Sequence, residues 1–425
     1  MPRIPLLLGL ALFLGAESRS QESWTLEKCY EAALKRSESL LIGQAELDQA
    51  TARLRQLRGA TLPQISLRLS EQIQDSSGEQ GGVAGTFLNR SRPEAKIHLG
   101  QALFSGFQDL ALLAAAKAQR KVEQEELEAA RRALGEDLAR AFYTALDRGK
   151  NLESLEELQR LTQDRLRELK GRVSLGRSRK SELISIELQL RNIQADQAGA
   201  NKDFARAGEM LAYFLGQKPT VFEEGKTPDE KEQAEFEGWA AHLDKRPDIQ
   251  ALEARRISAD RGLAAARRAR WPLIRAEGNY FLHRTGIQEN VDWDGLLTLD
   301  WPLFSGGSAR ARMDEAKAQG AEAEARFSQA KRKAGMDCLG AWEDLRASLE
   351  SLRAYSEAQR LAEENYSLQA ADYRLGLATN LEVLAALNQL HESRRNLDRA
   401  RVQVSLDFFL LRAVSGAPLF GKELP

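Results

Sequence analysis

The chain has 425 residues, and its 61 Lys and Arg residues are balanced by 62 Asp and Glu residues. Because the two signs of charge are interleaved along the chain, the composition does not favour nucleic acid as a partner. Charged residues make up 29% and aromatic residues only 7%. Long stretches rich in Ala, Glu, Arg and Leu are typical of coiled coils, which argues against an ordinary enzyme.

Residues 1–18 have the pattern of a signal peptide. Arg3 supplies the positive end, an apolar run follows from Ile4 to Gly15, and Ala16 and Ser18 are the small residues that a signal peptidase recognises. The run is too short to cross a bilayer as a helix. We therefore expect an exported chain that is cleaved after Ser18.

Residues 19–216 form the first of two predicted repeats. Apolar residues recur at helical spacing from about residue 25 to Pro63, which disfavours continuation of a helix. The period then changes to 2 in two segments, at about 64–74 and 94–104, so we expect a strand pair joined by a loop of about 18 residues. A helical hairpin follows, and its tip is predicted at Gly176 because glycine commonly ends a helix.

Residues 217–244 differ in composition, with Pro219, Pro228 and many acids, which indicates a linker or an equatorial lobe. The second repeat, residues 245–416, has the same order of segments. Its strand pair is predicted at about 273–283 and 293–303, and its hairpin tip at Gly376. Residues 417–425 are a short tail.

The two repeats are related by a constant shift of 200 residues. A Leu-Phe-Ser-Gly segment at 103–106 returns at 303–306, an Ala-Lys-Ala-Gln segment at 116–119 returns at 316–319, and Gly216 returns as Gly416. Several matches at one offset indicate a tandem duplication of a long unit. In each copy the Leu-Phe-Ser-Gly segment marks the change from strand to helix.

Each predicted strand has about ten residues with alternating polar and apolar side chains, and aromatic residues flank the strands. This length and pattern fit a strand that crosses the outer membrane in a β-barrel, although a water-soluble sheet packed on helices would alternate too. The export signal favours the barrel. Four strands cannot close a barrel, and open strand edges in lipid leave backbone groups unsatisfied, so we expect at least two chains to pool their strands.

The order and spacing of these segments resemble the TolC-like outer membrane factor (outer membrane efflux protein) family over nearly the whole mature chain. The matching motifs are Trp24-Thr25-Leu26-Glu27, Leu62-Pro63, Trp271-Pro272, Arg246-Pro247-Asp248-Ile249, Pro302-Leu303-Phe304-Ser305-Gly306-Gly307 and the endings Leu215-Gly216 and Ser415-Gly416.

The resemblance implies a mixed α and β fold in a homotrimer. Long coiled-coil hairpins would form a trimeric α-barrel in the periplasm, joined to a 12-stranded β-barrel in the outer membrane, with four strands from each chain. The implied function is an exit duct for a tripartite efflux system or a type I secretion system, exporting small molecules or polypeptides. Its implied partners are a periplasmic adaptor, an inner-membrane pump or ABC transporter, and outer membrane lipid.

In the family, the second hairpin narrows the periplasmic entrance. Measured from the tip glycine, this chain retains a tyrosine as Tyr373 and an acid as Glu382, and Glu182 is the equivalent acid in the first repeat. The positions of the family's arginine and second acid are Ala378 and Ala385, which puts a salt-bridged gate in doubt. Thr379 and Glu382 also have the spacing of a capping box, and this role is compatible with a place at the pore entrance.

The resemblance also assigns roles to the two tips and to the two strand-to-helix junctions. The expected adaptor-contacting residues are Leu175, Gly176, Arg177, Ser178, Leu375, Gly376 and Leu377, although plain helix–helix turns would have the same pattern. The expected junction residues, near the inner lipid boundary, are Phe104, Gly106, Phe304 and Gly306.

The sequence offers no chemistry that would indicate an enzyme or a cofactor. Its four histidines, His98, His242, His283 and His391, are isolated from one another and from the two cysteines, so no zinc spacing is present. His98 and His283 fall on polar strand positions, where we expect them to face water. Cys29 and Cys338 are compatible with a disulfide, but two isolated buried thiols are the simpler expectation.

Two alternative functions remain from the sequence alone. A periplasmic coiled-coil adaptor or scaffold would also have an export signal and a helical tip, but it would lack four amphipathic strands and would be extracted without detergent. An exported enzyme would need a constellation of polar residues that the sequence does not provide.

Overall fold

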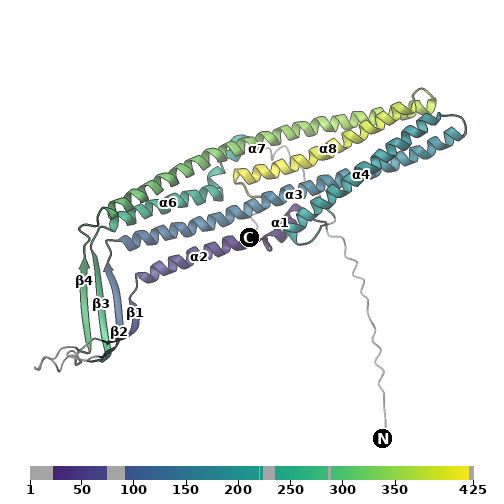
Figure 1. Cartoon of the computed structure of the whole chain (residues 1–425). Helices are drawn as coiled ribbons and strands as arrows, with labels where there is room; N and C mark the ends of the chain where they lie inside the picture. Colours follow the sequence, from purple (N-terminus) through teal and green to yellow (C-terminus); the bar gives the residue numbers. More distant parts are fainter. Residues whose placement is uncertain (1–22, 74–90, 220, 224–234, 286–288, 421–425) are drawn as a thin grey trace, which may run out of the picture. The chain divides into compact units, whose positions relative to one another are not determined.

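The computed structural model describes residues 23–73, 91–219, 221–223, 235–285 and 289–420 (Figure 1). The predicted signal peptide, most of the loop between the first two strands and part of the 217–244 segment lie outside these residues. The elements are α1 (Leu26–Leu34), α2 (Glu38–Ala60), β1 (Gln64–Ile73), β2 (Ser91–Phe104), α3 (Gln108–Ser174), α4 (Lys180–Leu215), α5 (Phe236–Ala240), η3 (Leu243–Lys245), α6 (Pro247–Arg268), β3 (Leu273–Arg284), β4 (Trp293–Asp300), α7 (Ser308–Leu375) and α8 (Asn380–Ser415).

The predicted mixed α and β fold is confirmed, because the described chain combines long helical hairpins with one four-stranded sheet. None of its described helices is long and apolar enough to span a bilayer. The chain divides into two compact units. Among the described residues, unit 1 comprises those within 23–36, 137–223 and 348–406, and unit 2 comprises those within 37–136, 235–347 and 407–420, so that α3, α7 and α8 contribute to both.

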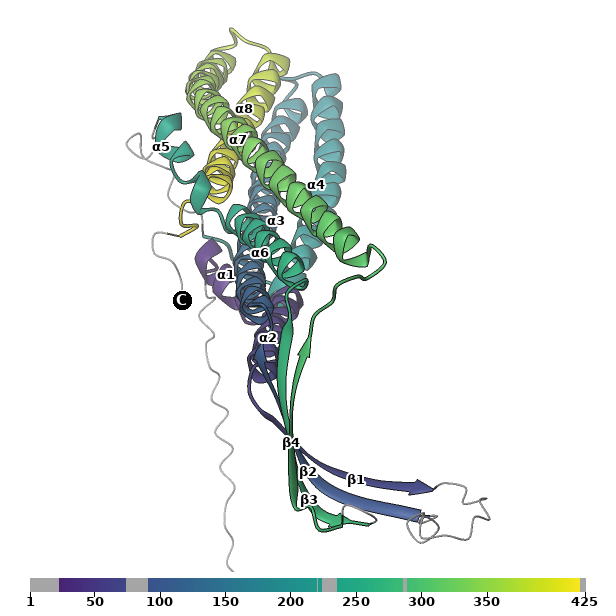
Figure 2. The ribbon, with the colours of Figure 1, turned by 90° about the vertical axis from the view of Figure 1, so that its left-hand side faces the viewer.

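The sheet of unit 2 has the strand order β1-β2-β3-β4, and all neighbours are antiparallel (Figure 2). Ile97 of β2 is opposite Leu67 of β1 and Tyr280 of β3, and Tyr280 is opposite Trp293 of β4. Directly opposed residues in antiparallel strands share a face. One face of the sheet is therefore apolar across all four strands, and it is exposed: Leu67 is 63% and Trp293 71% accessible.

The opposite face of the sheet contains a continuous polar row. Ser66, His98, Asn279 and Asp294 are opposed in register, one on each strand. The Nδ1 atom of His98 lies 2.9 Å from Oδ1 of Asn279, and Nδ2 of Asn279 donates to Oδ1 of Asp294 at 2.7 Å. His98 is therefore on the polar face, as its sequence position predicts, but it bonds a neighbouring side chain there.

Three element boundaries differ from the sequence prediction. The single helix expected from about residue 25 to Pro63 is broken at Lys35–Ser37, where Ser37 adopts an extended conformation before α2. Strand β2 begins at Ser91, earlier than predicted, because residues of β2 pair with β1 as far as Ile73, the last residue of β1. Strand β4 ends at Asp300, since Pro302 has no N–H to donate to the ladder.

Two arginines of unit 2 hold the end of α8. Nη2 of Arg132 in α3 donates to the carbonyls of Arg412, Ala413 and Ala417 at 3.0, 3.0 and 2.8 Å. Arg246, which also pairs with Asp248, donates to the Val414 carbonyl at 2.8 Å. The last carbonyls of a helix have no intrahelical partner, so these contacts satisfy groups that would otherwise be left unbonded. This gives the Arg246-Pro247-Asp248 motif a structural role.

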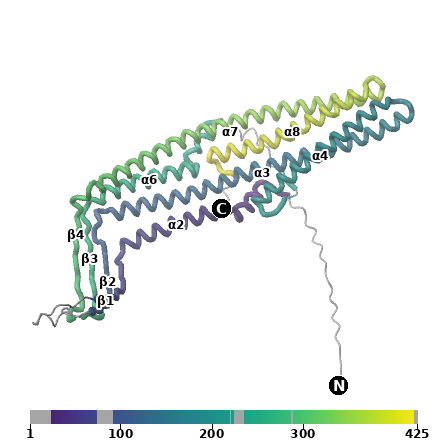
Figure 3. The backbone as a smooth tube through the Cα atoms, viewed as in Figure 1, coloured from purple at the N-terminus to yellow at the C-terminus, as the bar shows by residue number. Residues whose placement is uncertain are grey.

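In unit 1, the α3–α4 and α7–α8 hairpins turn at the same end (Figure 3). Leu169 of α3, Ile186 of α4 and Leu384 of α8 form a buried apolar cluster near these turns. Arg394 of α8 pairs with Glu157 of α3 at 3.3 Å and with Glu363 of α7 at 3.6 Å. The hairpins of this unit are thus joined by apolar packing and by ion pairs.

The two cysteines are free thiols, and both are buried. Desolvation raises the pKa of Cys29 to about 12, and burial also raises the pKa of Cys338. Both thiols are therefore protonated at neutral pH and unreactive as nucleophiles.

The buried His391 of α8 should make unit 1 less stable at acidic pH. Its side chain is 3% exposed, and neither ring nitrogen has a partner among the described residues. Desolvation lowers its pKa, so the unfolded chain binds a proton more readily than the folded chain. We expect stability to be complete above the unfolded histidine pKa of about 6.5 and to fall below it by at most about 1.4 kcal/mol per pH unit.

The measurement is the thermal unfolding midpoint at pH 7.5 and 5.5 for the wild type and His391→Gln. The variant should lose less stability on acidification than the wild type. His242→Gln is the matched control, because His242 is partly exposed and its ring bonds the Gly238 carbonyl. An equal pH effect in all three proteins would contradict the prediction.

Candidate functional site

The two hairpin tips in unit 1 have the same backbone geometry. Gly176 and Gly376 have φ values of 71° and 79°, in the left-handed region that glycine tolerates. The Arg177 amide donates to the Arg172 carbonyl at 2.8 Å, and the Leu377 amide donates to the Asp372 carbonyl at 2.9 Å. Each tip therefore ends its long helix in a Schellman motif.

The tips present exposed leucines, as the sequence predicts. Leu175 is 69%, Leu375 74% and Leu377 77% accessible. Arg177 is also exposed, whereas Ser178 is half-buried. The tip geometry thus leaves apolar side chains available to a partner at two glycine turns.

Tyr373 is buried beside the second tip. It is 8% accessible, and its ring lies under the guanidinium groups of Arg165 and Arg172 of α3, at 4.4 and 4.7 Å from the ring centroid. Glu168 joins the two arginines, with Oε2 3.0 Å from Arg165 and Oε1 3.1 Å from Arg172. Tyr373 therefore connects α7 to α3 through two cation–π contacts, which are strongest when the partners are shielded from water.

Glu382 closes a capping box at the start of α8. Its Oε2 atom accepts from the backbone amide of Thr379 at 2.6 Å and from the Thr379 hydroxyl at 2.8 Å, and the Glu382 amide lies 3.4 Å from Thr379 Oγ1. The bond from the Thr379 backbone lowers the pKa of Glu382. The capping role predicted from the sequence is confirmed. Glu182 lies in the first turn of α4 without such a box, because Arg179 replaces the threonine.

The first strand-to-helix junction, in unit 2, is tightly packed. Gly106 has a φ of 61°, and a Cβ atom there would lie 2.4 Å from Cβ of Trp271 and 3.1 Å from the Arg268 carbonyl oxygen. Arg268 also donates to the Phe107 carbonyl at 3.1 Å. The ring of Phe104 contacts that of Phe107 edge to face at 5.3 Å. This junction is held against the end of α6.

The second junction is open. Gly306 has a φ of 59°, but nothing lies within 4 Å of the position its Cβ would take. Phe304 is 90% accessible. The two junctions share a glycine conformation and differ in packing, although their Leu-Phe-Ser-Gly sequences are identical.

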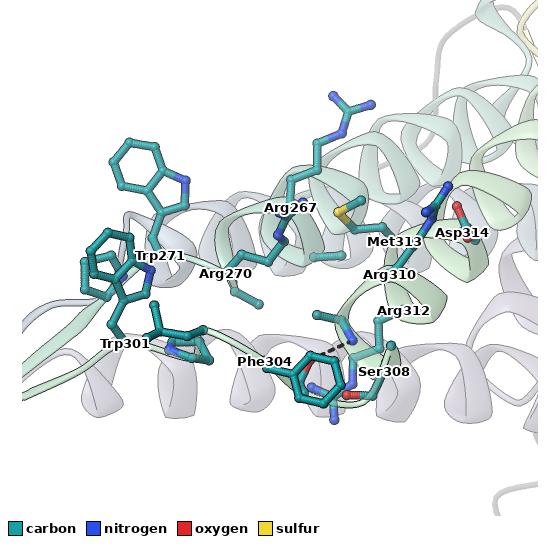
Figure 4. A pocket seen from close by; sticks show the side chains of 18 of the residues that line it. Arg267, Arg270, Trp271, Trp301, Phe304, Ser308, Arg310, Arg312, Met313 and Asp314 are labelled. Atoms are coloured by element: carbon teal, nitrogen blue, oxygen red, sulfur yellow. Dashed lines mark hydrogen bonds between the residues drawn. The ribbon is translucent and has the colours of Figure 1, made fainter.

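A pocket of about 1470 Å³ lies beside the second junction, where α6 ends, β4 ends and α7 begins (Figure 4). Trp271 and Trp301 lie toward one end of it, and arginines of α6 and α7 line the remainder (Figure 4). The pocket therefore combines exposed aromatic rings with positive charge.

Comparison with known proteins identifies the family. The family described as outer membrane efflux protein matches residues 29–217 and 240–417. The chain belongs to this family. The match covers both predicted repeats and leaves out most of the segment between them.

Outer membrane efflux proteins are transport channels of the outer membrane with a large periplasmic part, and this chain is such a channel. The outer membrane protein TolC of Vibrio cholerae is 24% identical over 425 residues, covering 97% of this chain and 95% of that protein. The family is a class of channels, not of enzymes.

Solved structures of bacterial membrane proteins have the same fold. A membrane protein from Pseudomonas aeruginosa superimposes with a TM-score of 0.80 at 20% identity, covering 92% of this chain and 90% of its own. The outer membrane protein VceC of Vibrio cholerae superimposes with a TM-score of 0.78 at 20% identity, covering 92% and 96%. The resemblance inferred from the motifs is thus confirmed.

Sequence reasoning missed the partners of Tyr373. Arg165 and Arg172 are seven residues apart on α3, and so they lie on one helix face together with the buried Leu169. This spacing indicates that the two arginines can contact the same group. No pattern within α3 indicates that this group is a tyrosine about two hundred residues further along the chain. In the part of the chain that the structure describes, no group of three His, Cys, Asp or Glu residues could hold a metal ion.

Proposed function

We propose that three copies of this channel protein form one exit duct. Each copy contributes four strands to a closed β-barrel in the outer membrane and two helical hairpins to a periplasmic α-barrel. The tips meet a periplasmic adaptor, which connects the duct to an inner-membrane pump or ABC transporter.

The observation that supports this proposal most strongly is the sheet of unit 2. Its order leaves β1 and β4 as edge strands, and one face is apolar and exposed on all four strands. In lipid, each unpaired backbone group on these edges costs several kcal/mol, so the edges require partners from other copies. The polar row on the other face, from Ser66 to Asp294, then faces an aqueous lumen.

The tips supply the surface for the adaptor. Leu175, Leu375 and Leu377 are exposed at turns whose backbone is held by Schellman bonds, so a partner meets them at low entropic cost. The proposed adaptor surface also includes the other tip residues, Gly176, Gly376, Arg177 and Ser178. Tyr373, Glu382 and Glu182 lie near the same end, and we place them at the pore entrance.

Cryo-electron microscopy of the full chain in detergent tests the proposal. The expected result is three subunits around one axis, with a closed barrel of strands. A monomeric particle, or protein recovered from cells without detergent, would contradict it. Conductance across a planar bilayer tests independently whether the assembled protein forms a channel through the membrane.

The role of Glu382 at the entrance has a test of its own. Glutamine retains the capping acceptor and removes the charge. We therefore expect Glu382→Gln channels to lose part of their cation preference while unit 1 remains folded. The measurement is the reversal potential in a salt gradient.

Thr379→Val is the matched variant, because it removes the cap hydroxyl and retains the carboxylate. It should leave ion selectivity unchanged and loosen the start of α8. Glu382 has a lowered pKa, so the contribution of its charge to the cap is complete above the ordinary glutamate pKa and is lost as pH falls through the lowered value. If the ion selectivity of Glu382→Gln channels were unchanged, the placement of Glu382 at the pore entrance would be contradicted.

A further inference from the structure

We propose that the pocket beside the second junction binds the phosphate of an anionic phospholipid in the periplasmic leaflet of the outer membrane. This inference rests on the proposed function, because it requires the strands to lie in the membrane, α6 to end at its inner surface and α7 to begin there. The pocket is lined by Arg267 at the end of α6, by Arg270 just after it, and by Arg310 and Arg312 from the start of α7 (Figure 4).

These four arginines are unneutralised in the described structure. None of them forms an ion pair with a described residue, and Asp314 is the one acid among the residues that line the pocket. The chain as a whole is almost neutral, with 61 basic and 62 acidic residues, so this is a local excess of charge. The planar guanidinium group binds phosphate oxygens in a bidentate manner, which suits arginine better than lysine to this ligand.

The position of two of these arginines opposes the dipole of their own helix. Arg310 and Arg312 lie in the first two turns of α7, and the first turn contains no acid. Cations at the N-terminus of a helix are unfavourable, because the backbone amides already give that end a partial positive charge. An anion bound at this point would neutralise the arginines and the helix end together.

The exposed aromatic residues that line the pocket indicate that the bound anion also has an apolar part. Trp271 is 56%, Trp301 60% and Phe304 90% accessible, although all three line a pocket that also contains the arginines. Tryptophan is enriched at membrane interfaces, where its ring meets acyl chains and its N–H remains near water. A lipid presents a phosphate and an apolar chain together, whereas free phosphate would leave the rings without a partner.

A second copy of the chain is a poorer occupant. In a closed barrel, β4 would pair with β1 of the next copy, and α2 leads directly into β1. The last turns of α2 expose Arg53, Arg55 and Arg58. The neighbouring copy would therefore bring further positive charge to the pocket, and an anionic headgroup between the two sets of arginines would neutralise both. Basic segments at a membrane surface attract anionic lipids by this electrostatic effect.

The test uses the full chain, reconstituted into phosphatidylcholine vesicles with a minor share of phosphatidylglycerol and then extracted in mild detergent. The ratio of the two lipids that remain with the protein is measured by mass spectrometry. We expect the wild type to retain phosphatidylglycerol above its share in the vesicle. The Arg267→Gln/Arg270→Gln/Arg310→Gln/Arg312→Gln variant should lose this enrichment, by about fivefold for each arginine that contacts the lipid.

The matched control removes the same number of charges elsewhere. Its substitutions, Arg191→Gln, Arg206→Gln, Arg326→Gln and Arg332→Gln, all affect exposed arginines outside the pocket. This control should retain the enrichment. The inference is overturned if the pocket variant also retains it, or if inorganic phosphate displaces the lipid, which would indicate a small-anion site.

A further result would reassign the pocket. If the pocket variant retains the lipid but loses assembled particles, the pocket is a contact between copies, and the inference fails. The state of assembly separates the two proposals. A wild-type protein that forms no particles of three subunits contradicts the proposed duct, whereas an assembled protein without lipid enrichment contradicts the lipid site alone.

Discussion

Replacing Gly106 by alanine should destabilise unit 2 by about 2–5 kcal/mol, from left-handed backbone strain together with overpacking. The new Cβ atom would lie 2.4 Å from Cβ of Trp271, closer than two carbon atoms approach, so the junction must move away from α6. Since β2 and α3 meet at this junction, the movement should disturb the strand-to-helix geometry. We expect a lower thermal unfolding midpoint and a smaller fraction of assembled particles, measured by circular dichroism and by size-exclusion chromatography in detergent.

Gly306→Ala is the matched control for this prediction. Gly306 has nearly the same φ, but no atom lies within 4 Å of its Cβ position, so alanine there meets only the backbone strain of about 1–2 kcal/mol. The bulkier Gly306→Val should disturb the second junction while leaving the tips unaffected. Equal destabilisation by the two alanine variants would show that strain, and not the contact with Trp271, decides the effect.

A double-mutant cycle isolates the contact. Trp271→Gly removes the Cβ atom that alanine at position 106 would meet. If the clash is responsible, Gly106→Ala should cost less in the Trp271→Gly background than in the wild type, and the difference is the interaction energy of the pair. Additive effects of the two substitutions would contradict the structural explanation.

The regular elements were predictable because their signals are local. Alternation of polar and apolar residues located all four strands, and the glycines at 176 and 376 located both tips, where left-handed φ values are found. The capping box of Thr379 and Glu382 was predictable for the same reason, since both partners lie within one turn. Strands, helix ends and caps depend on residues that are close in sequence, so the local sequence pattern is enough to predict them.

The contacts between distant segments were not predictable in this way. The two junctions have identical Leu-Phe-Ser-Gly sequences, yet only Gly106 packs against Trp271. Tyr373 was expected at the pore entrance, and the structure adds that its ring is covered by Arg165 and Arg172. In both cases the deciding partner is more than 150 residues away in the chain, and no local pattern specifies it.

The arginines that cover Tyr373 should hold the second hairpin against α3 and so restrain the channel entrance. Each cation–π contact is worth about 0.5–2 kcal/mol, depending on how far water is excluded from it. Removing both in Arg165→Gln/Arg172→Gln should shift an equilibrium between closed and open entrances by about tenfold or more toward open. The measurement is open probability and single-channel conductance in planar bilayers.

The chain offers matched controls for each part of this contact. Arg160→Gln/Arg167→Gln removes two exposed arginines of α3 with the same spacing and the same change of charge, and it should leave gating unchanged. Tyr373→Phe retains the aromatic face and should behave like the wild type, whereas Tyr373→Leu should open the entrance as the double arginine variant does. If Tyr373→Phe opened the channel, the hydroxyl would be the restraining group, and the cation–π explanation would fail.

Glu168 forms ion pairs with both arginines that cover the Tyr373 ring. Its two carboxylate oxygens contact one arginine each, so it positions both guanidinium groups over the ring. Glu168→Gln should therefore weaken both contacts partially, giving an open probability between those of the wild type and Arg165→Gln/Arg172→Gln. Adding Glu168→Gln to the double arginine variant should have no further effect on gating, because the groups that it positions are already absent.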